Sequence, residues 1–228
     1  MTKPFVVSIE GNIGAGKTTI IENLQKHLGN NKSIVFLREP VDVWDTVKGA
    51  NGETMLQKFY EDPKQNAFPF QVMAYATRLS LIRKTIAENP DCDVIICERS
   101  IDADKQIFAK MLHDDGMIND MNFQIYNLFA REYAVEFALD GIVYIDSDAE
   151  VCHARIMKRS RLGEGGIELG YLQKCRRYHE EWLCNDHIPI LKLDTNADVT
   201  YNAEDVDDMG MKWLRNIESF INEIVSKK

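Results

Sequence analysis

The stretch GNIGAGKT, residues 11–18, constrains the fold more than any other part of this chain. A glycine, four further residues and then Gly-Lys-Thr stand between the apolar run 5–9 and a helical pattern at residues 19–28. Glycines let backbone N–H groups converge on an anion, and the following helix adds its N-terminal partial positive charge. The pattern therefore predicts a phosphate-binding loop, a P-loop, formed by Gly11, Asn12, Ile13, Gly14, Ala15, Gly16, Lys17, Thr18 and Thr19.

Further apolar runs, rich in valine and isoleucine, follow along the chain and end in charged or polar residues. They lie at residues 34–39, 94–99, 142–147 and 188–194. Nearly unbroken apolar strands are typical of a parallel sheet that is buried on both faces, and helical patterns separate these runs. The sequence therefore predicts an α/β fold, a five-stranded parallel sheet doubly wound with helices on both faces. We found no repeat or linker and expect one domain over residues 1–228.

The acidic composition argues against several classes of partner. The formal net charge is -9, with a pI of about 5.1, so a large basic surface for nucleic acid or anionic lipid is not expected. The sequence contains no apolar run of membrane-spanning length and no leader pattern at its start, which favours a cytoplasmic protein without a membrane partner. Its five cysteines form no Cys-x-x-Cys pair and are read as reduced thiols, without a transition-metal site.

Two acids and an arginine end two of the predicted strands. Glu39 follows one apolar run and precedes a proline that favours an extended backbone, and Glu98 and Arg99 follow another. In an open parallel sheet, ligands lie beyond the carboxyl ends of the strands, beside the predicted P-loop. There, one carboxylate can accept a proton, a second can help to hold Mg²⁺ and the arginine can offset charge during phosphoryl transfer to a hydroxyl. We expect Thr18 and Glu98 to be the magnesium ligands.

Other nucleotide-binding classes fit less well. The Asn-Lys-x-Asp signature of a GTPase is missing from the later strand ends, and a motor or AAA-type ATPase needs a longer chain. Among these classes, the sequence therefore favours a small-molecule kinase. Two alternatives stay open: a nucleoside monophosphate kinase, such as a thymidylate kinase, and a non-catalytic nucleotide-binding switch. The first needs a second arginine group for the acceptor phosphate, for which only Arg78 and Arg83 are available near residues 39–80.

Taken together, these stretches resemble the deoxynucleoside kinase family. The similarity runs in family order from SIEGNIGAGKTT at residue 8, through REPVDVW and ERSIDADKQIFAK, to IPILKLDTNAD at residue 188. The resemblance implies that ATP or another nucleoside triphosphate, with Mg²⁺, donates a phosphoryl group to the 5′-hydroxyl of a deoxynucleoside in nucleotide salvage. It also implies a homodimer, and residues 123–139 carry apolar side chains on more than one helical face.

The resemblance also implies roles for individual residues. Glu39 matches the carboxylate that meets the 5′-hydroxyl and is our candidate general base, although Glu98 matches a second acid that could take that role. Arg99 matches the group that holds the 5′-oxygen and the transferred phosphoryl group. The remaining expected substrate contacts are Tyr60 and Glu164 at the sugar 3′-hydroxyl, Gln71 at the base edge, and Trp44, Leu56, Phe70 and Phe108 as walls around the base. Several of these apolar residues could equally be plain core.

Arg78 and Asp104 bear on which base is accepted. In the family that this chain resembles, charged residues at these positions accompany cytosine or purine selectivity, and thymidine-accepting members have uncharged ones. An aspartate can accept a hydrogen bond from an exocyclic amino group, whereas thymine presents only a carbonyl at that edge. We therefore predict a purine deoxynucleoside or deoxycytidine in preference to thymidine.

An arginine-rich segment beside three glycines predicts a lid over residues 155–166. Arg155 and Arg159 lie four residues apart, on one helical face, and Arg161 follows. Like charges this close repel, so an anionic ligand would explain them, and the glycines would permit closure that excludes water. Farther on, Asp198 in DTNAD matches a loop that touches the donor base, and Val199 replaces an aromatic residue that some family members carry.

Overall fold

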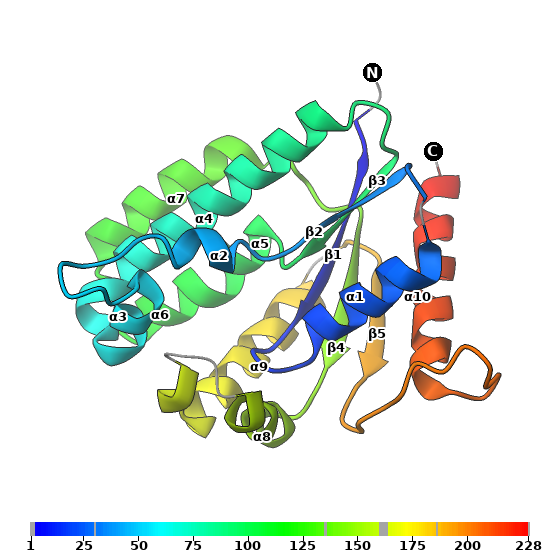
Figure 1. Ribbon diagram of the computed structural model, residues 1–228. Helices are drawn as coiled ribbons and strands as arrows, with labels where there is room; N and C mark the ends of the chain where they lie inside the picture. The colour runs from blue at the N-terminus through cyan, green and yellow to red at the C-terminus, as the bar shows by residue number, and fades with distance from the viewer. Residues whose placement is uncertain (1–2, 30, 135, 160–163, 186, 228) are drawn as a thin grey trace.

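The computed structural model describes residues 3–29, 31–134, 136–159, 164–185 and 187–227. Within them lies one five-stranded sheet, which confirms the predicted α/β class (Figure 1). The strands are β1 (Phe5–Gly11), β2 (Ile34–Leu37), β3 (Val94–Glu98), β4 (Gly141–Asp146) and β5 (Ile190–Asp194). Their order is β2-β3-β1-β4-β5, and every pairing is parallel.

The central strand β1 supports the site through its register with its neighbours. Ile9 lies opposite Glu98 of β3, and Gly11 lies opposite Ile145 of β4, so the P-loop and the end of β3 leave the sheet side by side. Alternate side chains of β1 enter different cores: Val6 faces one hydrophobic cluster and Val7 the other. This alternation is why the strands read as continuous apolar runs.

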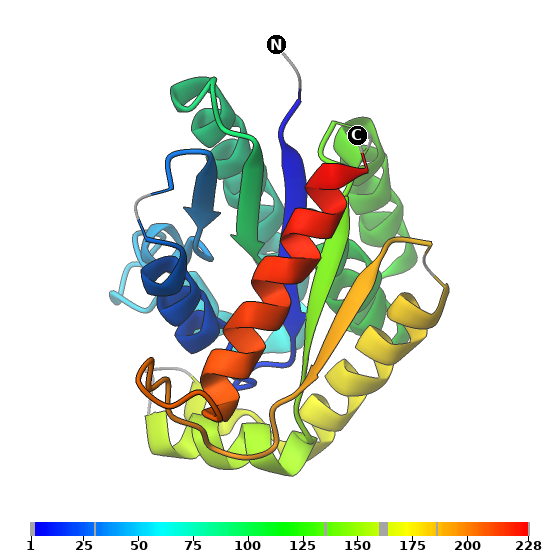
Figure 2. The ribbon, with the colours of Figure 1, turned by 90° about the vertical axis from the view of Figure 1, so that its right-hand side faces the viewer.

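Helices cover both faces of the sheet, as predicted. Helices α1 (Lys17–Leu28), α8 (Ala149–Arg159) and α10 (Met209–Ser226) contribute to the core on one face. Helices α4 (Pro63–Glu88), α7 (Asp120–Ala134) and α9 (Leu169–Asn185) contribute to the core on the other. Figure 2 shows α10 crossing the near face of the sheet, and α4 and α7 lie behind the sheet.

The long helix α4 contains a proline in its interior. It begins at Pro63, where the Asp62 side chain accepts a hydrogen bond from the Gln65 N–H at 3.2 Å, and it passes through Pro69 without ending. Its apolar side chains face both the sheet-side core and a smaller cluster that includes Phe70 and Ala74. Contacts on more than one side explain why the sequence shows no clean helical stripe.

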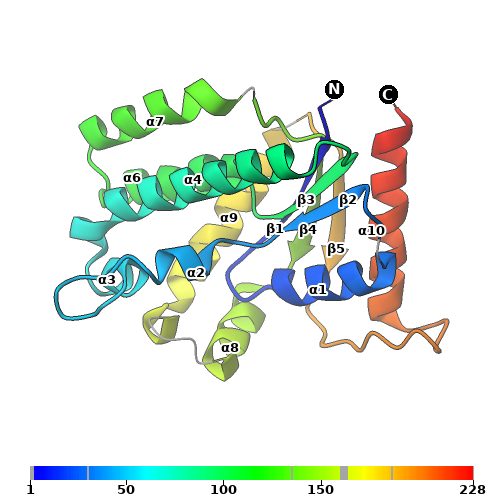
Figure 3. The same cartoon turned by 45° about the horizontal axis from the view of Figure 1, so that its top comes forward.

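Short elements close the end of the molecule beyond the strands. They are α2 (Val41–Trp44), α3 (Met55–Glu61), α5 (Ile101–Ala103), the π-helix η1 (Asp104–Ala109), α6 (Lys110–Asp114) and the 3₁₀ turn η2 (Glu164–Gly166). In Figure 3, α2 and α3 lie beside the first half of α4. Among the described residues, no helix combines the length and apolar character needed to cross a membrane.

Candidate active site

A cavity of about 590 Å³ opens at the carboxyl end of the sheet. Side chains from the P-loop, β3, α2, α3, α4, η1, α8 and the segment after β5 line it. It brings together most of the predicted site residues: Ile13, Gly14, Ala15, Gly16, Lys17, Thr18, Thr19, Glu39, Trp44, Leu56, Tyr60, Phe70, Gln71, Arg78, Glu98, Arg99, Asp104, Phe108, Arg155, Arg159, Glu164 and Asp198. Gly11 and Asn12 do not line it, and Arg161 lies outside the described residues.

The P-loop has a backbone that only glycine fits at two points. Gly11 has φ +150° and Gly14 has φ +79°. A Cβ on Gly11 would lie 2.6 Å from the carbonyl oxygen of Ile145, and one on Gly14 would lie 2.6 Å from that of Cys152 on α8. The glycine spacing thus lets the loop pack tightly against β4 and the start of the predicted lid helix.

Lys17 points back into its own loop. Its Nζ donates to the carbonyl oxygens of Gly11 at 3.1 Å and Asn12 at 2.8 Å. Burial, together with the charge of Arg99, lowers the Lys17 pKa to about 8. An ammonium that is held by neutral carbonyls and desolvated in this way is suited to receive a polyphosphate, whose charge would favour the protonated form.

Thr18 and Glu98 meet at the start of α1. The Thr18 hydroxyl donates to Glu98 Oε1 at 2.5 Å, so a hydroxyl from the P-loop and a carboxylate from β3 stand together. Hard oxygen ligands of this kind, completed by water and phosphate oxygens, suit Mg²⁺. The two residues therefore fit the predicted magnesium ligands in type and position.

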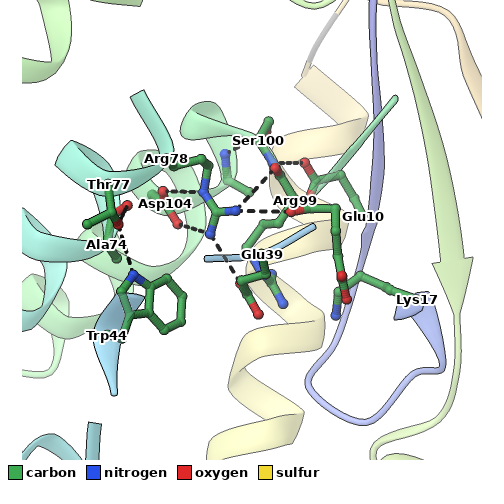
Figure 4. Close-up of polar contacts among 12 residues, drawn as sticks. Glu10, Lys17, Glu39, Trp44, Ala74, Thr77, Arg78, Arg99, Ser100 and Asp104 are labelled. Atoms are coloured by element: carbon green, nitrogen blue, oxygen red, sulfur yellow. Dashed lines mark hydrogen bonds and ion pairs between the residues drawn. The ribbon is translucent and has the colours of Figure 1, made fainter. Parts of the chain in front are cut away.

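Two arginines hold Glu39, which lines the cavity, and Figure 4 shows these side chains together. Glu39 Oε1 accepts from Arg78 Nη2 at 3.1 Å and from Arg99 Nε at 3.3 Å. Burial acts to raise the Glu39 pKa, but the charges of Arg99, Arg78 and Lys17 outweigh it and hold the pKa at about 2. Glu39 is therefore an anion at neutral pH, and its position is fixed by its two guanidinium partners.

The turn after β3 is strained at Arg99, whose φ is +65°. A left-handed conformation costs a non-glycine residue roughly 1–2 kcal/mol, so the surroundings must hold it. The Arg99 N–H donates to Ile9 O at 3.1 Å, and its guanidinium lies 4.5 Å from the Phe108 ring centroid. The adjacent Ser100 N–H donates to Glu10 Oε1 at 2.8 Å.

Sequence reasoning missed Glu10. This acid lies fully buried in β1, one residue before the P-loop, and burial raises its pKa. Its bond to the Ser100 N–H supports the strained turn that carries Arg99. A signal was available: a carboxylate inside a largely apolar central strand needs a polar partner when it is buried.

The base-side walls of the cavity are also a small hydrophobic core. Phe59 stacks on Phe70 with ring centroids 4.7 Å apart, and Trp44 meets Phe70 edge-on at 5.5 Å. The Trp44 indole N–H donates to Thr77 Oγ1 at 2.8 Å, which fixes the ring. The two readings left open for these aromatic residues, cavity wall and core, are thus compatible.

Gln71 is the polar exception on this wall. Its side chain is 2 % exposed, and Oε1 has no hydrogen-bond partner among the described residues. Buried amide oxygens are seldom left without a donor, so one facing a cavity indicates a ligand that supplies it. The exocyclic amino group of a nucleobase is such a donor.

Tyr60 and Glu164 approach one another from α3 and η2, as the 3′-hydroxyl prediction requires. Burial raises the Tyr60 pKa, and the charge of Glu164 raises it further, so the phenol keeps its proton. Glu164 is buried and forms an ion pair with Arg159. A neutral hydroxyl beside a carboxylate can exchange hydrogen bonds with a sugar hydroxyl.

The lid arginines have protein partners in this structure. Arg155 Nη2 lies 3.0 Å from Asp198 Oδ1, and Arg159 pairs with Glu164. Both side chains line the phosphate end of the cavity. The glycine hinge falls only partly within the described residues: Gly165 and Gly166 form the turn η2, whereas Gly163 lies outside them.

Other lining residues escaped the sequence analysis because they come from distant segments. Tyr171 on α9, Tyr201 after β5 and Trp213 on α10 all reach the cavity, as does Lys158 on α8. The sequence does not tell an aromatic ring that packs in the core or faces solvent from one that faces a ligand.

Comparison with known proteins agrees with this geometry. The family model described as "Deoxynucleoside kinase" matches residues 7–221. A probable deoxycytidine kinase of Fowlpox virus (strain NVSL) is 35% identical, covering 96% of this chain and 88% of the relative. Deoxycytidine kinase of Homo sapiens is 34% identical, covering 92% of this chain and 91% of the relative. The mitochondrial deoxyguanosine kinase of Xenopus laevis is 29% identical, covering 89% of this chain and 86% of the relative. With its P-loop, the acids at the sheet edge and a match over nearly its whole length, this chain belongs to the deoxynucleoside kinase family of phosphotransferases.

Proposed function

We propose that this enzyme transfers the γ-phosphoryl group of ATP to the 5′-hydroxyl of a deoxyribonucleoside and so forms the 5′-monophosphate for nucleotide salvage. The observation that carries the proposal is the common cavity of Lys17, Glu39 and Arg99. It has a cationic phosphate end, an acid at its centre and an apolar pocket with one buried amide at its far end. A nucleoside and a triphosphate laid end to end match that order.

Glu39 is proposed to orient the 5′-hydroxyl and accept its proton. An acid with a pKa of about 2 is a weak base toward a free alcohol. Phosphoryl transfer passes through a loose transition state, in which the proton leaves late and alignment matters more than base strength. Glu39 is therefore required to be charged and correctly placed, and its two arginine contacts secure both.

Arg99 and Lys17 are proposed to compensate charge on the transferring group. Thr18 and Glu98 would hold Mg²⁺, which would supply positive charge beside the donor phosphates. The arginines of α8 would bind the triphosphate once it displaces their present partners, Asp198 and Glu164. ATP is the donor implied by family membership, and these residues would hold any nucleoside triphosphate by its phosphates.

Deoxycytidine or a purine deoxynucleoside is proposed as the acceptor, in preference to thymidine. Asp104 is buried on the cavity wall, and Gln71 lies there with an oxygen that has no donor within the described part of the chain. An exocyclic amino group can donate to such oxygens, whereas the thymine O4 carbonyl would face them with a second acceptor. The relatives described above, a deoxycytidine kinase and a deoxyguanosine kinase, agree with this class.

A homodimer and a cytoplasmic location complete the proposal. On α7, Met121, Ile125 and Leu128 are 74%, 51% and 65% exposed and lie at helical spacing, so they form an apolar stripe that suits a second copy. The five cysteines are free thiols, as they would be in a reducing compartment. Sedimentation as a monomer at micromolar concentration would contradict the dimer.

The test is an assay of the purified chain with ATP and Mg²⁺ against the four deoxynucleosides and their monophosphates. The proposal expects 5′-monophosphate to form from deoxycytidine or a purine deoxynucleoside. Thymidine as the best acceptor would contradict the base preference. Reaction of monophosphates alone would favour a monophosphate kinase, and ATP binding without transfer would favour a nucleotide-binding switch.

A further inference from the structure

All the N–H donors of the Arg78 guanidinium form hydrogen bonds within the protein. Nε donates to Asp104 Oδ2 at 2.9 Å, and Nη2 donates to Asp104 Oδ1 at 3.4 Å and to Glu39 Oε1 at 3.1 Å. Nη1 donates to the backbone carbonyls of Glu98 at 3.0 Å and Arg99 at 3.4 Å. A guanidinium has five N–H groups, and these are five contacts, so none is left over for a nucleobase.

The carbonyl contacts fall on the most strained part of the backbone. They come from the residue with φ +65° and from the one before it, in the turn that presents Glu98 and Arg99 to the cavity. Glu10 holds the Ser100 N–H of the same turn from the sheet side. The turn is thus held on one side by a carboxylate and on the other by Arg78.

The remaining contacts join two separate functions. Asp104 belongs to the base end of the cavity and Glu39 to its reacting end, and one planar group bonds both (Figure 4). Because the guanidinium is rigid, it sets the spacing between the two carboxylates and the turn. Its charge, with that of Arg99, also keeps Glu39 ionised.

We propose that Arg78 is a positioning residue of phosphoryl transfer and makes no hydrogen bond to the nucleobase. It holds Glu39 and the Glu98–Ser100 turn in their reacting geometry, and base reading is left to Gln71 and to the remaining lone pairs of Asp104. This inference rests on the proposed function and assigns to Arg78 a role that its place on the base-side wall would not suggest.

The experiment compares Arg78→Met and Arg78→Lys with the unaltered enzyme, measuring kcat, KM and the pH profile of kcat/KM for its best deoxynucleoside. Lys84→Met is the matched control, since Lys84 is exposed on the same helix and pairs with the exposed Glu88. For Arg78→Met we expect kcat to fall on the order of 10- to 100-fold, as for a misplaced reacting group. We also expect the acidic side of the kcat/KM profile, its acid limb, to move to higher pH, because the variant lacks a cation that lowers the Glu39 pKa.

Arg78→Lys keeps the charge but not the five-donor geometry, so it should lose turnover while its acid limb stays close to the original. Lys84→Met should change neither quantity. Thermal unfolding of each variant would be followed in parallel, since Arg78→Met leaves Asp104 buried and unpaired.

Two results would overturn the proposal. One is an unchanged kcat and acid limb for the best acceptor, with altered rates only for other bases, which would make Arg78 a direct reader of the base. The other is failure of both Arg78 variants to fold, which would make its role purely structural. If the unaltered enzyme phosphorylates no deoxynucleoside, the proposed function fails instead, so the two failures are distinguishable.

Discussion

The two ends of the cavity are built differently. At the acceptor end, Arg78 is buried and holds both Asp104 and the partly exposed Glu39, and stacked rings form the walls. At the donor end, Lys17 is held by the carbonyls of its own loop, and Arg155 pairs with Asp198, which is 84% exposed. The cation at the first end is therefore held by buried protein contacts, whereas the cations at the other end have contacts that a polyphosphate could replace.

That contrast indicates where specificity and closure arise. A preorganised wall discriminates by leaving poor ligands with unpaired polar groups. Exposed cation–carboxylate pairs contribute little stability, so exchanging them for phosphate oxygens costs little and permits movement. Substrate choice should thus depend on rigid residues and turnover on movable ones.

The strongest test of this contrast is Glu39→Gln. The substitution keeps the shape and the arginine contacts of one oxygen but removes the charge, so kcat should fall on the order of 1,000-fold, within the range of general acid–base effects. Steady-state kinetics would measure it, with Glu61→Gln on the exposed side of α3 as the control. A loss below tenfold would transfer the role of proton acceptor to Glu98.

A smaller effect is expected at the donor end from Arg159→Ala. If Arg159 binds the donor phosphates, kcat should fall about 10- to 100-fold, with little change in the equilibrium binding of the deoxynucleoside. Arg177→Ala, which removes an exposed arginine from an i,i+4 pair on α9, is the control. Equal losses in turnover and deoxynucleoside affinity would argue against a lid role.

Lys17 offers a test by pH. Its pKa of about 8 lies below its ordinary value of 10.5, so between these values the folded protein binds fewer protons than the unfolded chain. Without added nucleotide, the enzyme should therefore gain stability as pH rises through this window.

ATP should reverse that loss of charge, because its phosphates favour the ammonium. Binding near pH 9 should take up close to one proton, and affinity should weaken as pH rises further. Calorimetry in two buffers of different ionisation enthalpy measures the uptake, and Lys17→Met should abolish it. If the unaltered enzyme takes up no proton, Lys17 is already protonated before ATP binds.

The smallest expected effect concerns the rigidity of the acceptor wall. Thr77→Val removes the partner of the Trp44 indole N–H and should destabilise the protein by about 1–3 kcal/mol, the cost of a buried donor left unpaired. Thr77→Ser keeps the hydroxyl and should cost less. Urea unfolding compares the two, and equal stability would show that the wall does not need this bond.

The sequence predicted those parts of the molecule that depend on local pattern. The P-loop glycines, the apolar strands and the acids Glu39 and Glu98 at their ends follow from spacing and from the rule that parallel strands meet at one edge. The partners of Arg78 could not be predicted, because all five acceptor contacts lie 20 or more residues away in sequence. Two go to the carboxylate of Asp104, two to the backbone carbonyls of Glu98 and Arg99, and the fifth to Glu39. The positive φ of Arg99 is likewise not predicted by any pattern in the sequence.

The π-helix η1 has a consequence for how this pocket can be altered. Its wider turn carries Asp104 and Phe108, which both line the cavity. Removing one residue between them would restore ordinary α-helical pitch and turn one side chain about 100° relative to the other. Length changes in this one turn thus offer a route to new substrate preferences that leaves the side chains themselves unchanged.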